Sequence, residues 1–142
     1  MMHKCKAGIT FARMEKKIIH TDQAPAPIGP YSQAVQSGNI LFISGQIALD
    51  PRTGNIVKDN IEAETKQVMD NLEAILREAG MDFSNILKST IFLMSMDQFA
   101  TVNTVYGSYF TDSSSYPARE TVQVAGLPRG VNVEISMIAA AK

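Results

Sequence analysis

The clearest pattern in the chain is a run of apolar residues at helical spacing in its middle third. Asp59, followed three residues later by Glu62, is suited to cap the start of this helix, and Gly80 is suited to end it. A second stretch with helical spacing follows Asp97, which we expect to be its N-cap. The two apolar stripes are Val68, Met69, Leu72, Ile75, Leu76 and Ala79, and then Phe99, Val102, Tyr106, Tyr109 and Phe110. The pattern therefore predicts two amphipathic helices.

Shorter apolar and alternating runs, bounded by turn residues, predict the strands. Ser37-Gly38-Asn39 is a hairpin signal, and Asp50-Pro51-Arg52-Thr53-Gly54 predicts a turn. The predicted strands are 17–20, 32–36, 40–47, 86–96, 119–125 and 131–140. The order β-β-β-α-β-α-β-β predicts an α/β (α+β) domain in which two helices pack on one face of a mixed sheet.

Side-chain alternation in the last two strands predicts one polar and one apolar face. We place Val122 and Val124 beneath the helices. Arg119, Thr121 and Gln123 are then expected on the uncovered face. The final strand adds Val133, Ile135 and Met137 to the covered face and Asn132, Glu134 and Ser136 to the uncovered one. Other apolar residues on the uncovered face would form a patch best hidden by oligomerisation.

Length and charge narrow the possible classes of protein. The 142 residues fit one domain, which we assign to residues 14–142. The net charge of -1 gives no global positive field, so nucleic-acid binding is not expected. Cys5 is the single cysteine, which excludes an internal disulfide and fits a reducing compartment. No apolar run approaches the about 18 residues of a membrane span, so we expect a cytoplasmic protein.

Residues 1–13 differ from the rest because they carry Lys4, Lys6 and Arg13 and no acid. We interpret them as a dispensable N-terminal extension. An organellar presequence, a tag remnant and genuine structure stay open as alternatives.

The candidate chemistry lies at Arg119, which follows Pro117-Ala118, and at Glu134, between Val133 and Ile135. A guanidinium can hold a substrate carboxylate bidentately, and a glutamate can orient water or move a proton. Either residue could instead be an ordinary surface charge. Burial would raise the pKa of Glu134 and a nearby arginine would lower it, so the sequence leaves that balance open.

The spacing of these two residues raises a geometric difficulty. If Pro128-Arg129 formed a hairpin turn, Arg119 would lie opposite Ile138, about four residues or roughly 13 Å along the sheet from Glu134. A long side chain and a bound ligand could bridge part of this distance, and a site built from two subunits would remove it.

An ordered set of motifs along residues 16–140 resembles the RidA (YjgF) family of imine and enamine deaminases. The set is Ile28-Gly29-Pro30-Tyr31-Ser32-Gln33-Ala34, Ser44-Gly45-Gln46-Ile47, Glu64-Thr65-Lys66-Gln67, Asn71-Leu72, Ala100-Thr101-Val102-Asn103, Pro117-Ala118-Arg119 and Val133-Glu134-Ile135. The resemblance implies a chorismate-mutase-like homotrimer with sites between subunits and no metal or organic cofactor. The implied reaction is hydrolysis of 2-iminobutanoate and 2-iminopropanoate to 2-oxoacids and ammonia, which limits metabolite damage.

The resemblance also implies roles for individual residues. Arg119 corresponds to the carboxylate-binding arginine and Glu134 to the residue that positions the attacking water. Many deaminating members have Ser-Cys after the arginine, where this chain has Glu120-Thr121. We keep Thr121 as a substrate-binding candidate and expect Glu120 to add negative charge near the site.

Four further positions correspond to the surroundings of the substrate. Tyr31, Ser44 and Asn103 correspond to pocket residues, and Gly45 to a backbone contact beside them. Ser44 lacks a plausible histidine base, so hydrogen bonding is favoured over nucleophilic attack. Tyr31 could equally be a packing residue, and Asn103 could be solvated because it lies off the apolar stripe.

Two other functions stay open from the sequence. A trimer with the same pocket could bind 2-oxoacids as a regulator without hydrolysing imines. An RNA-directed role, as an endoribonuclease or translation inhibitor, is disfavoured by the net charge of -1 and the lack of a basic-aromatic stripe. His3 and His20, with one cysteine, offer no metal-ligand spacing, so no metal site is predicted.

Overall fold

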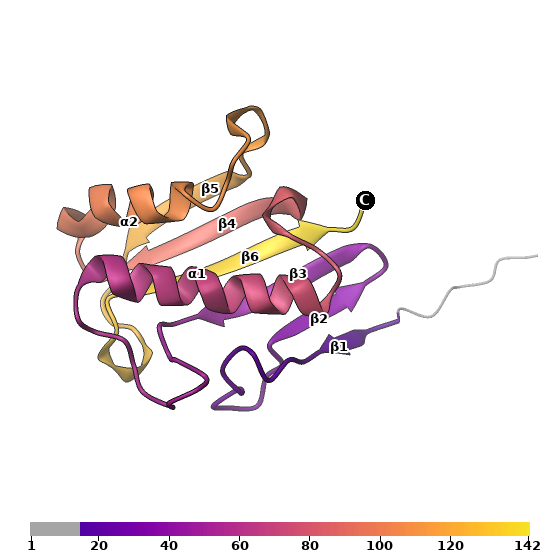
Figure 1. The fold of residues 1–142 in the computed structure, drawn as a ribbon, viewed down its shortest axis with the longest axis horizontal. Coiled ribbons are helices and arrows are strands. Elements are labelled where there is room, and N and C mark those ends of the chain that lie inside the picture. Colours follow the sequence, from indigo (N-terminus) through magenta and orange to yellow (C-terminus); the bar gives the residue numbers. More distant parts are fainter. Residues whose placement is uncertain (1–14) are drawn as a thin grey trace, which may run out of the picture.

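The computed structural model describes residues 15–142, so the extension predicted over residues 1–13 lies outside the described residues. The chain forms a six-stranded sheet, and α1 (Ile61–Glu78) and α2 (Phe99–Gly107) pack on one face of it, as predicted (Figure 1). The strands are β1 (Lys17–Ile19), β2 (Ala34–Ser37), β3 (Ile40–Gln46), β4 (Ile86–Leu93), β5 (Ala118–Gln123) and β6 (Val133–Ala140). Their spatial order is β1-β2-β3-β6-β4-β5, with β4 and β5 parallel and the other neighbours antiparallel.

The last two strands do not form the hairpin considered from the sequence. Strand β6 lies between β3 and β4, whereas β5 pairs with β4 at the edge of the sheet. The physical reason is that α2 connects β4 to β5, and a strand that returns through a helix pairs in parallel. The chain leading from β5 to β6 then crosses the end of β4 instead of making a tight turn.

This pairing reverses the faces predicted for β5. Ser89 of β4 lies in register with Arg119, and Ser89 is fully buried beneath α2. Phe92 lies in register with both Val122 and Glu134. Residues in register share a face of the sheet. Arg119 is therefore on the helix-covered face, while Val122 and Glu134 are on the open one.

Helix α1 begins one residue later than predicted. Asn60, not Asp59, is its N-cap, and the Asn60 side chain accepts a hydrogen bond from the Ala63 backbone N–H at 2.7 Å. Gly80 follows the helix with φ at +74°, as its predicted role requires, since glycine adopts this left-handed conformation without strain.

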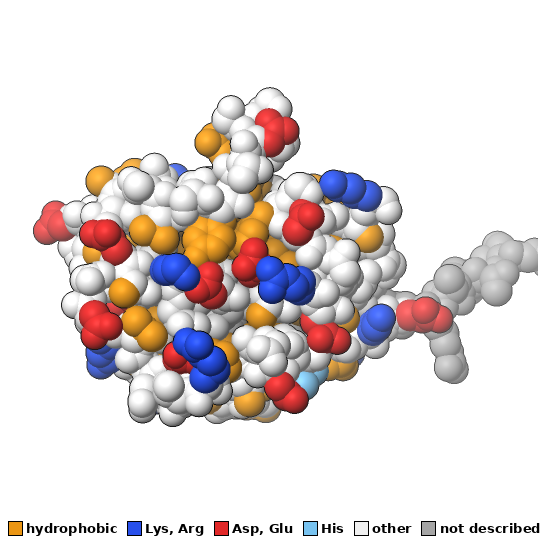
Figure 2. Space-filling view, in the orientation of Figure 1, with side chains coloured by type: hydrophobic (Ala, Val, Ile, Leu, Met, Phe, Trp, Pro, Cys, Tyr) orange, Lys and Arg blue, Asp and Glu red, His pale blue; other side chains and the backbone are white. Residues whose placement is uncertain are grey.

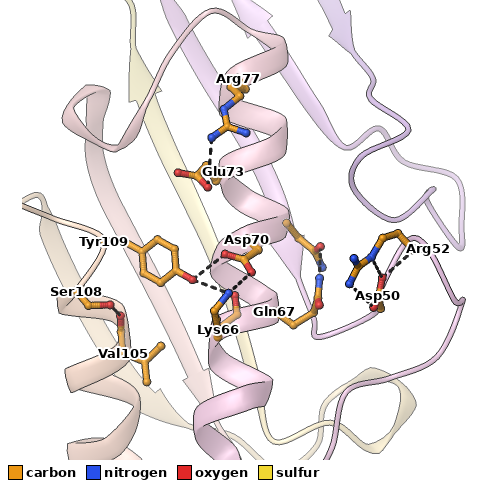
Figure 3. Close-up of polar contacts among 11 residues, drawn as sticks. Asp50, Arg52, Lys66, Gln67, Asp70, Glu73, Arg77, Val105, Ser108 and Tyr109 are labelled. Atoms are coloured by element: carbon orange, nitrogen blue, oxygen red, sulfur yellow. Dashed lines mark hydrogen bonds and ion pairs between the residues drawn. The ribbon is translucent and has the colours of Figure 1, made fainter.

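The start and end of α2 also differ from the prediction. A short 3₁₀ turn precedes the helix, and the Ser95 hydroxyl accepts a hydrogen bond from the Asp97 backbone N–H at 3.2 Å, so Asp97 is not the cap. Tyr109 and Phe110 lie just beyond the last residue of α2 but still pack against the core. The Tyr109 hydroxyl donates a hydrogen bond to Asp70 of α1 at 2.7 Å, which ties the two helical segments together (Figure 3).

The core lies between the helices and the helix-facing side of the sheet. Burial of these apolar side chains removes each from water and supplies about 1.5–3 kcal/mol per large residue. The predicted stripe of α1 is confirmed, because its members from Val68 to Leu76 are buried. The sheet contributes Leu41, Ile43, Ile91, Leu93, Val133, Ile135, Met137 and Ala139 to the same cluster.

The outer surface of the helices carries acidic and basic side chains interspersed with each other (Figure 2). On α1, Lys66 pairs with Asp70 at 2.8 Å and Arg77 with Glu73 at 3.6 Å, each one helical turn apart (Figure 3). This arrangement gives the helix-covered face no extended field of one sign.

Within residues 15–142, the opposite face of the sheet carries no helix and is partly apolar. Ile18, Val35, Phe42 and Ile138 follow one another in register across four strands. Phe42 is 49% exposed and Ile18 is 50% exposed. An exposed apolar row of this kind across several strands marks a surface suited to association with another protein.

Candidate active site

Arg119 lies at the edge of the helix-covered face, beside α2. Its Nη1 donates a hydrogen bond to Asn103 Oδ1 at 2.7 Å. Among residues 15–142, no carboxylate forms an ion pair with this arginine. The side chain opens into a hollow of about 420 Å³ lined by Asn103, Tyr106, Gly107, Tyr116, Pro117 and Arg119. The positive charge is therefore held in place but not neutralised, which suits an anionic ligand.

Two aromatic rings lie under the Arg119 guanidinium. Its central carbon lies 5.1 Å from the ring centroid of Tyr106 and 5.7 Å from that of Phe99. Burial raises the pKa of the Tyr106 phenol, so the ring stays neutral and presents an uncharged face to the arginine. Thr121 follows Arg119 on the same face, and its Oγ1 is buried without a hydrogen-bond partner in the described chain.

Glu134 lies on the open face, in a second hollow of about 380 Å³. The lining residues are Ile28, Tyr31, Ser44, Gly45, Ile47, Pro128 and Glu134. Burial raises the pKa of Glu134 above its ordinary value, and no arginine among residues 15–142 opposes this shift. Within one chain, therefore, desolvation of the carboxyl group sets the direction of the Glu134 pKa shift, which the sequence left open.

Gly45 provides the space that the Glu134 carboxylate occupies. A Cβ added to Gly45 would overlap Glu134 Oε2 and lie 2.9 Å from its Cδ. The pairing of β3 with β6 shifts register between Ile43 and Gln46, so Gly45 sits in an irregular segment that bends toward Glu134. The predicted site position thus has a structural role: the absence of a side chain lets the carboxylate approach the β3 backbone.

Tyr31 and Ser44 lie beside Glu134 and are held by the backbone. The Tyr31 hydroxyl accepts a hydrogen bond from the Ile28 backbone N–H at 3.3 Å, and the Tyr31 side chain remains 47% exposed. The Ser44 hydroxyl donates to the Ser32 carbonyl at 2.6 Å. Because that proton is already engaged, Ser44 retains only its oxygen lone pairs for a ligand.

The seven predicted site residues thus fall into two groups in one chain. Arg119, Asn103 and Thr121 lie on the helix-covered side, and the group around Glu134 lies on the open side. The expectation that Arg119 and Glu134 share a face is wrong. Glu120 also lies on the open side, where it accepts hydrogen bonds from Thr90 at 2.7 Å and pairs with Lys88 at 3.2 Å. Its negative charge does not face Arg119 of the same chain.

Three residues that support the site were not among those predicted from the sequence. Tyr106 and Phe99 were assigned only to the apolar stripe, although their spacing around Asn103 places all three on one side of α2. Glu64 is buried, and its carboxylate accepts hydrogen bonds from the backbone N–H groups of Asn132 and Val133 at 2.7 and 3.2 Å. Glu64 fixes the beginning of β6, next to Glu134, and an acid within an apolar helix face was the available signal.

Comparison with known proteins decides the family. A family model described as endoribonuclease L-PSP matches residues 21–141. The chain is a member of the RidA (YjgF) family. Membership confirms the resemblance drawn from the sequence motifs, and the mixed sheet with two helices is the RidA fold.

Three RidA-family relatives illustrate the similarity. The 2-iminobutanoate/2-iminopropanoate deaminase of Mus musculus is 51% identical over 124 residues, which cover 87% of this chain and 90% of the mouse protein. The crystal structure of RidA from the Antarctic bacterium Psychrobacter sp. PAMC 21119 has a TM-score of 0.84 at 40% identity, covering 88% of this chain and 99% of that one. The structure of E. coli TdcF with bound serine has a TM-score of 0.84 at 41% identity, covering 89% and 99%.

Two further features of residues 15–142 bear on the class of protein. Neither α1 nor α2 combines the length and apolar character that a membrane-crossing helix needs. Within the same residues, no three His, Cys, Asp or Glu side chains converge in a way that could hold a metal ion.

Proposed function

We propose that this RidA-family chain hydrolyses reactive 2-imino acids, such as 2-iminobutanoate and 2-iminopropanoate, to 2-oxoacids and ammonia. The observation that carries the proposal is the unneutralised guanidinium of Arg119 in an open hollow, held by the neutral amide of Asn103. A small carboxylate is a matching ligand, because a guanidinium binds it through two parallel hydrogen bonds.

The proposal includes a homotrimer in which the Arg119 hollow of one copy meets the Glu134 hollow of the next. Two features support it. The open face carries an exposed apolar row that includes Phe42 and Ile18. The two halves of the candidate site also lie on opposite sides of the same sheet, so one chain cannot close them around one ligand. A ring of copies would bring unlike surfaces together at each interface.

Replacing Phe42 by aspartate is expected to prevent assembly. A charge at the centre of the apolar row would have to be buried without a partner at the interface, which is strongly unfavourable. Analytical ultracentrifugation should give the mass of three chains for the wild type and of one chain for Phe42→Asp. Thr104→Asp, at an exposed position on α2, is the matched control and should still assemble. A Phe42→Asp protein that sediments like the wild type would count against this interface.

The reaction that follows from this geometry has three steps. The substrate carboxylate docks on Arg119. Glu134 of the neighbouring copy then accepts a proton from a water molecule while the oxygen of that water attacks the iminium carbon. Glu134 then gives that proton to the amino nitrogen of the carbinolamine. As the C–N bond breaks, the carbinolamine hydroxyl gives its proton to the Glu134 carboxylate and becomes the carbonyl of the 2-oxoacid, and the nitrogen leaves as ammonia. Release of that proton to solvent regenerates the carboxylate. Uncatalysed imine hydrolysis is already fast, so positioning of the water supplies much of the benefit.

The relatives support the same substrate class. The mouse protein carries the name 2-iminobutanoate/2-iminopropanoate deaminase, and TdcF was solved with serine, a small amino acid with a free carboxylate. A ligand of that size fits comfortably within a hollow of about 420 Å³.

The direct test generates the imine in the assay. A pyridoxal-phosphate dehydratase acting on threonine releases 2-iminobutanoate, which semicarbazide traps as a measurable adduct. We expect the wild-type protein to suppress trapping and to raise the yield of free 2-oxobutanoate by the matching amount. A protein that binds 2-oxobutanoate but leaves trapping unchanged would be the regulatory carboxylate binder instead. RNA binding with a steep salt dependence would point to the nucleic-acid role.

Gly45→Ala is expected to reduce imine hydrolysis by about 10²-fold, because the new Cβ displaces the Glu134 carboxylate. Circular dichroism should show an intact fold, since the added methyl group meets a movable side chain. Gly126→Ala is the matched control, because a Cβ at Gly126 meets nothing within 4 Å. If Gly45→Ala were as active as the wild type, the close approach of the Glu134 carboxylate to Gly45 would not be needed for hydrolysis.

A further inference from the structure

Within residues 15–142, neutral groups hold the Arg119 guanidinium, and no carboxylate pairs with it. Asn103 accepts a hydrogen bond from one end of the guanidinium, and the rings of Tyr106 and Phe99 lie beneath it at 5.1 and 5.7 Å. An acidic partner would fix the same orientation but would compete with an incoming carboxylate. Aromatic faces attract a cation through their quadrupole and leave its charge available.

Tyr106 is itself fixed by the sheet below. It is 6% exposed, and its hydroxyl donates a 2.9 Å hydrogen bond to Ser89, which is 0% exposed. Ser89 lies directly in register with Arg119 on the neighbouring strand. The ring that supports the guanidinium is therefore anchored next to the backbone position from which the guanidinium extends. These contacts, from Arg119 to Tyr106, from Tyr106 to Ser89 and back to the strand beside Arg119, restrict the orientations that the guanidinium can adopt.

We propose that Tyr106 is a positioning residue for Arg119, acting as an aromatic support that pre-orders the guanidinium for carboxylate binding. The inference rests on the proposed function for the identity of the ligand class, small 2-oxo and 2-imino acids. Pre-ordering lowers the entropy lost when the ligand binds, so the support strengthens binding without touching the reacting C=N bond. It therefore acts equally on the ground state and the transition state.

Tyr106→Leu is expected to weaken binding of 2-oxobutanoate, measured by calorimetry, by about 3-fold to 30-fold. The KM for the imine should rise by a similar factor while kcat changes little, which is the pattern for lost uniform binding. Local unfolding would instead lower kcat at unchanged KM. Tyr106→Phe keeps the ring and should retain most of the affinity. Tyr109→Leu is the matched control, because the polar partner of that tyrosine is Asp70 on α1.

The outcomes separate this inference from the proposed function. If folded Tyr106→Leu binds 2-oxobutanoate as tightly as wild type, or if Tyr106→Phe loses as much affinity as Tyr106→Leu, the aromatic support is refuted. If Tyr106→Leu does not fold, Tyr106→Met replaces it, because a flexible methionine side chain fills irregular core space without an aromatic ring, and an unchanged affinity has the same meaning. If the wild type hydrolyses no imine but its 2-oxobutanoate affinity still depends on Tyr106, the deaminase proposal fails and the positioning role stands.

Discussion

Arg119→Ala is expected to abolish most of the imine hydrolysis. The substrate carboxylate loses its bidentate partner, and removing one member of such a pair lowers affinity or rate by about 30-fold to 4,000-fold, equivalent to about 2–5 kcal/mol. The lower part of that range is expected, because the hollow around Arg119 is open and water can reach the unpaired carboxylate. The semicarbazide trapping assay gives the rate directly.

Two control variants separate shape from charge in this experiment. Arg119→Lys keeps the positive charge but lacks the planar fork, so we expect it to recover only part of the activity. Arg77→Ala removes an arginine that pairs with Glu73 on α1, outside both hollows, and should leave hydrolysis unchanged. If Arg119→Ala had wild-type activity, the proposed binding of the substrate carboxylate to Arg119 would be wrong.

Glu134→Gln is expected to lower the rate of hydrolysis by about 10²-fold to 10⁴-fold, because an amide cannot accept a proton from the attacking water. Binding of 2-oxobutanoate should change far less, since the carboxylate of this ligand docks on Arg119. The expected result is therefore a loss in kcat at similar KM, measured under the same trapping conditions. A large rise in KM with normal kcat would place Glu134 in binding instead.

The raised pKa of Glu134 sets the direction of the pH dependence. The ionised carboxylate is the active form, so the wild-type rate should rise as pH increases through the pKa of Glu134, which lies above its ordinary value of 4.5. The residual activity of Glu134→Gln should lack this limb. A neighbouring Arg119 would move the limb to lower pH, so Arg119→Ala should shift it upward if the two residues meet.

The same shift has a consequence for stability. A carboxyl group whose pKa is higher in the folded state stabilises the fold below its unfolded pKa, and this contribution disappears as pH rises through the folded pKa. At neutral pH the half-buried charge of Glu134 is therefore unfavourable. Glu134→Gln should raise Tm at pH 7 relative to wild type, and the difference should shrink toward pH 4 (about the unfolded pKa).

Mixing the two impaired variants tests whether the site spans two copies. Arg119→Ala and Glu134→Gln subunits, unfolded and reassembled together, should recover about a quarter of wild-type activity, because each mixed trimer contains one intact interface. Each variant reassembled alone should keep only its own low residual activity. Failure to recover activity in verified mixed trimers would contradict a site shared between neighbouring chains.

Much of the fold follows from local sequence. The apolar period of α1 and the two-residue Gly38-Asn39 loop between β2 and β3 depend only on neighbours in the chain, and the structure confirms both. The N-cap of α1 lies one residue from the predicted one, since Asn60 and Asp59 are nearly equivalent caps and packing selects between them. Residue type, local context and family motifs were enough to predict Arg119 and Glu134 as site residues. The pairing of the strands was not needed for this.

The sequence by itself determined which residues of each strand share a face, because side chains alternate along any strand. It did not determine which face that is for β5, since the answer depends on the strand with which β5 pairs. Only the tertiary structure decided that β6 enters between β3 and β4 and that β5 lies beside β4, which turns Arg119 toward α2 and away from Glu134. Strand pairing joins residues distant in the chain, and several registers satisfy the same alternation; the buried core selects one of them.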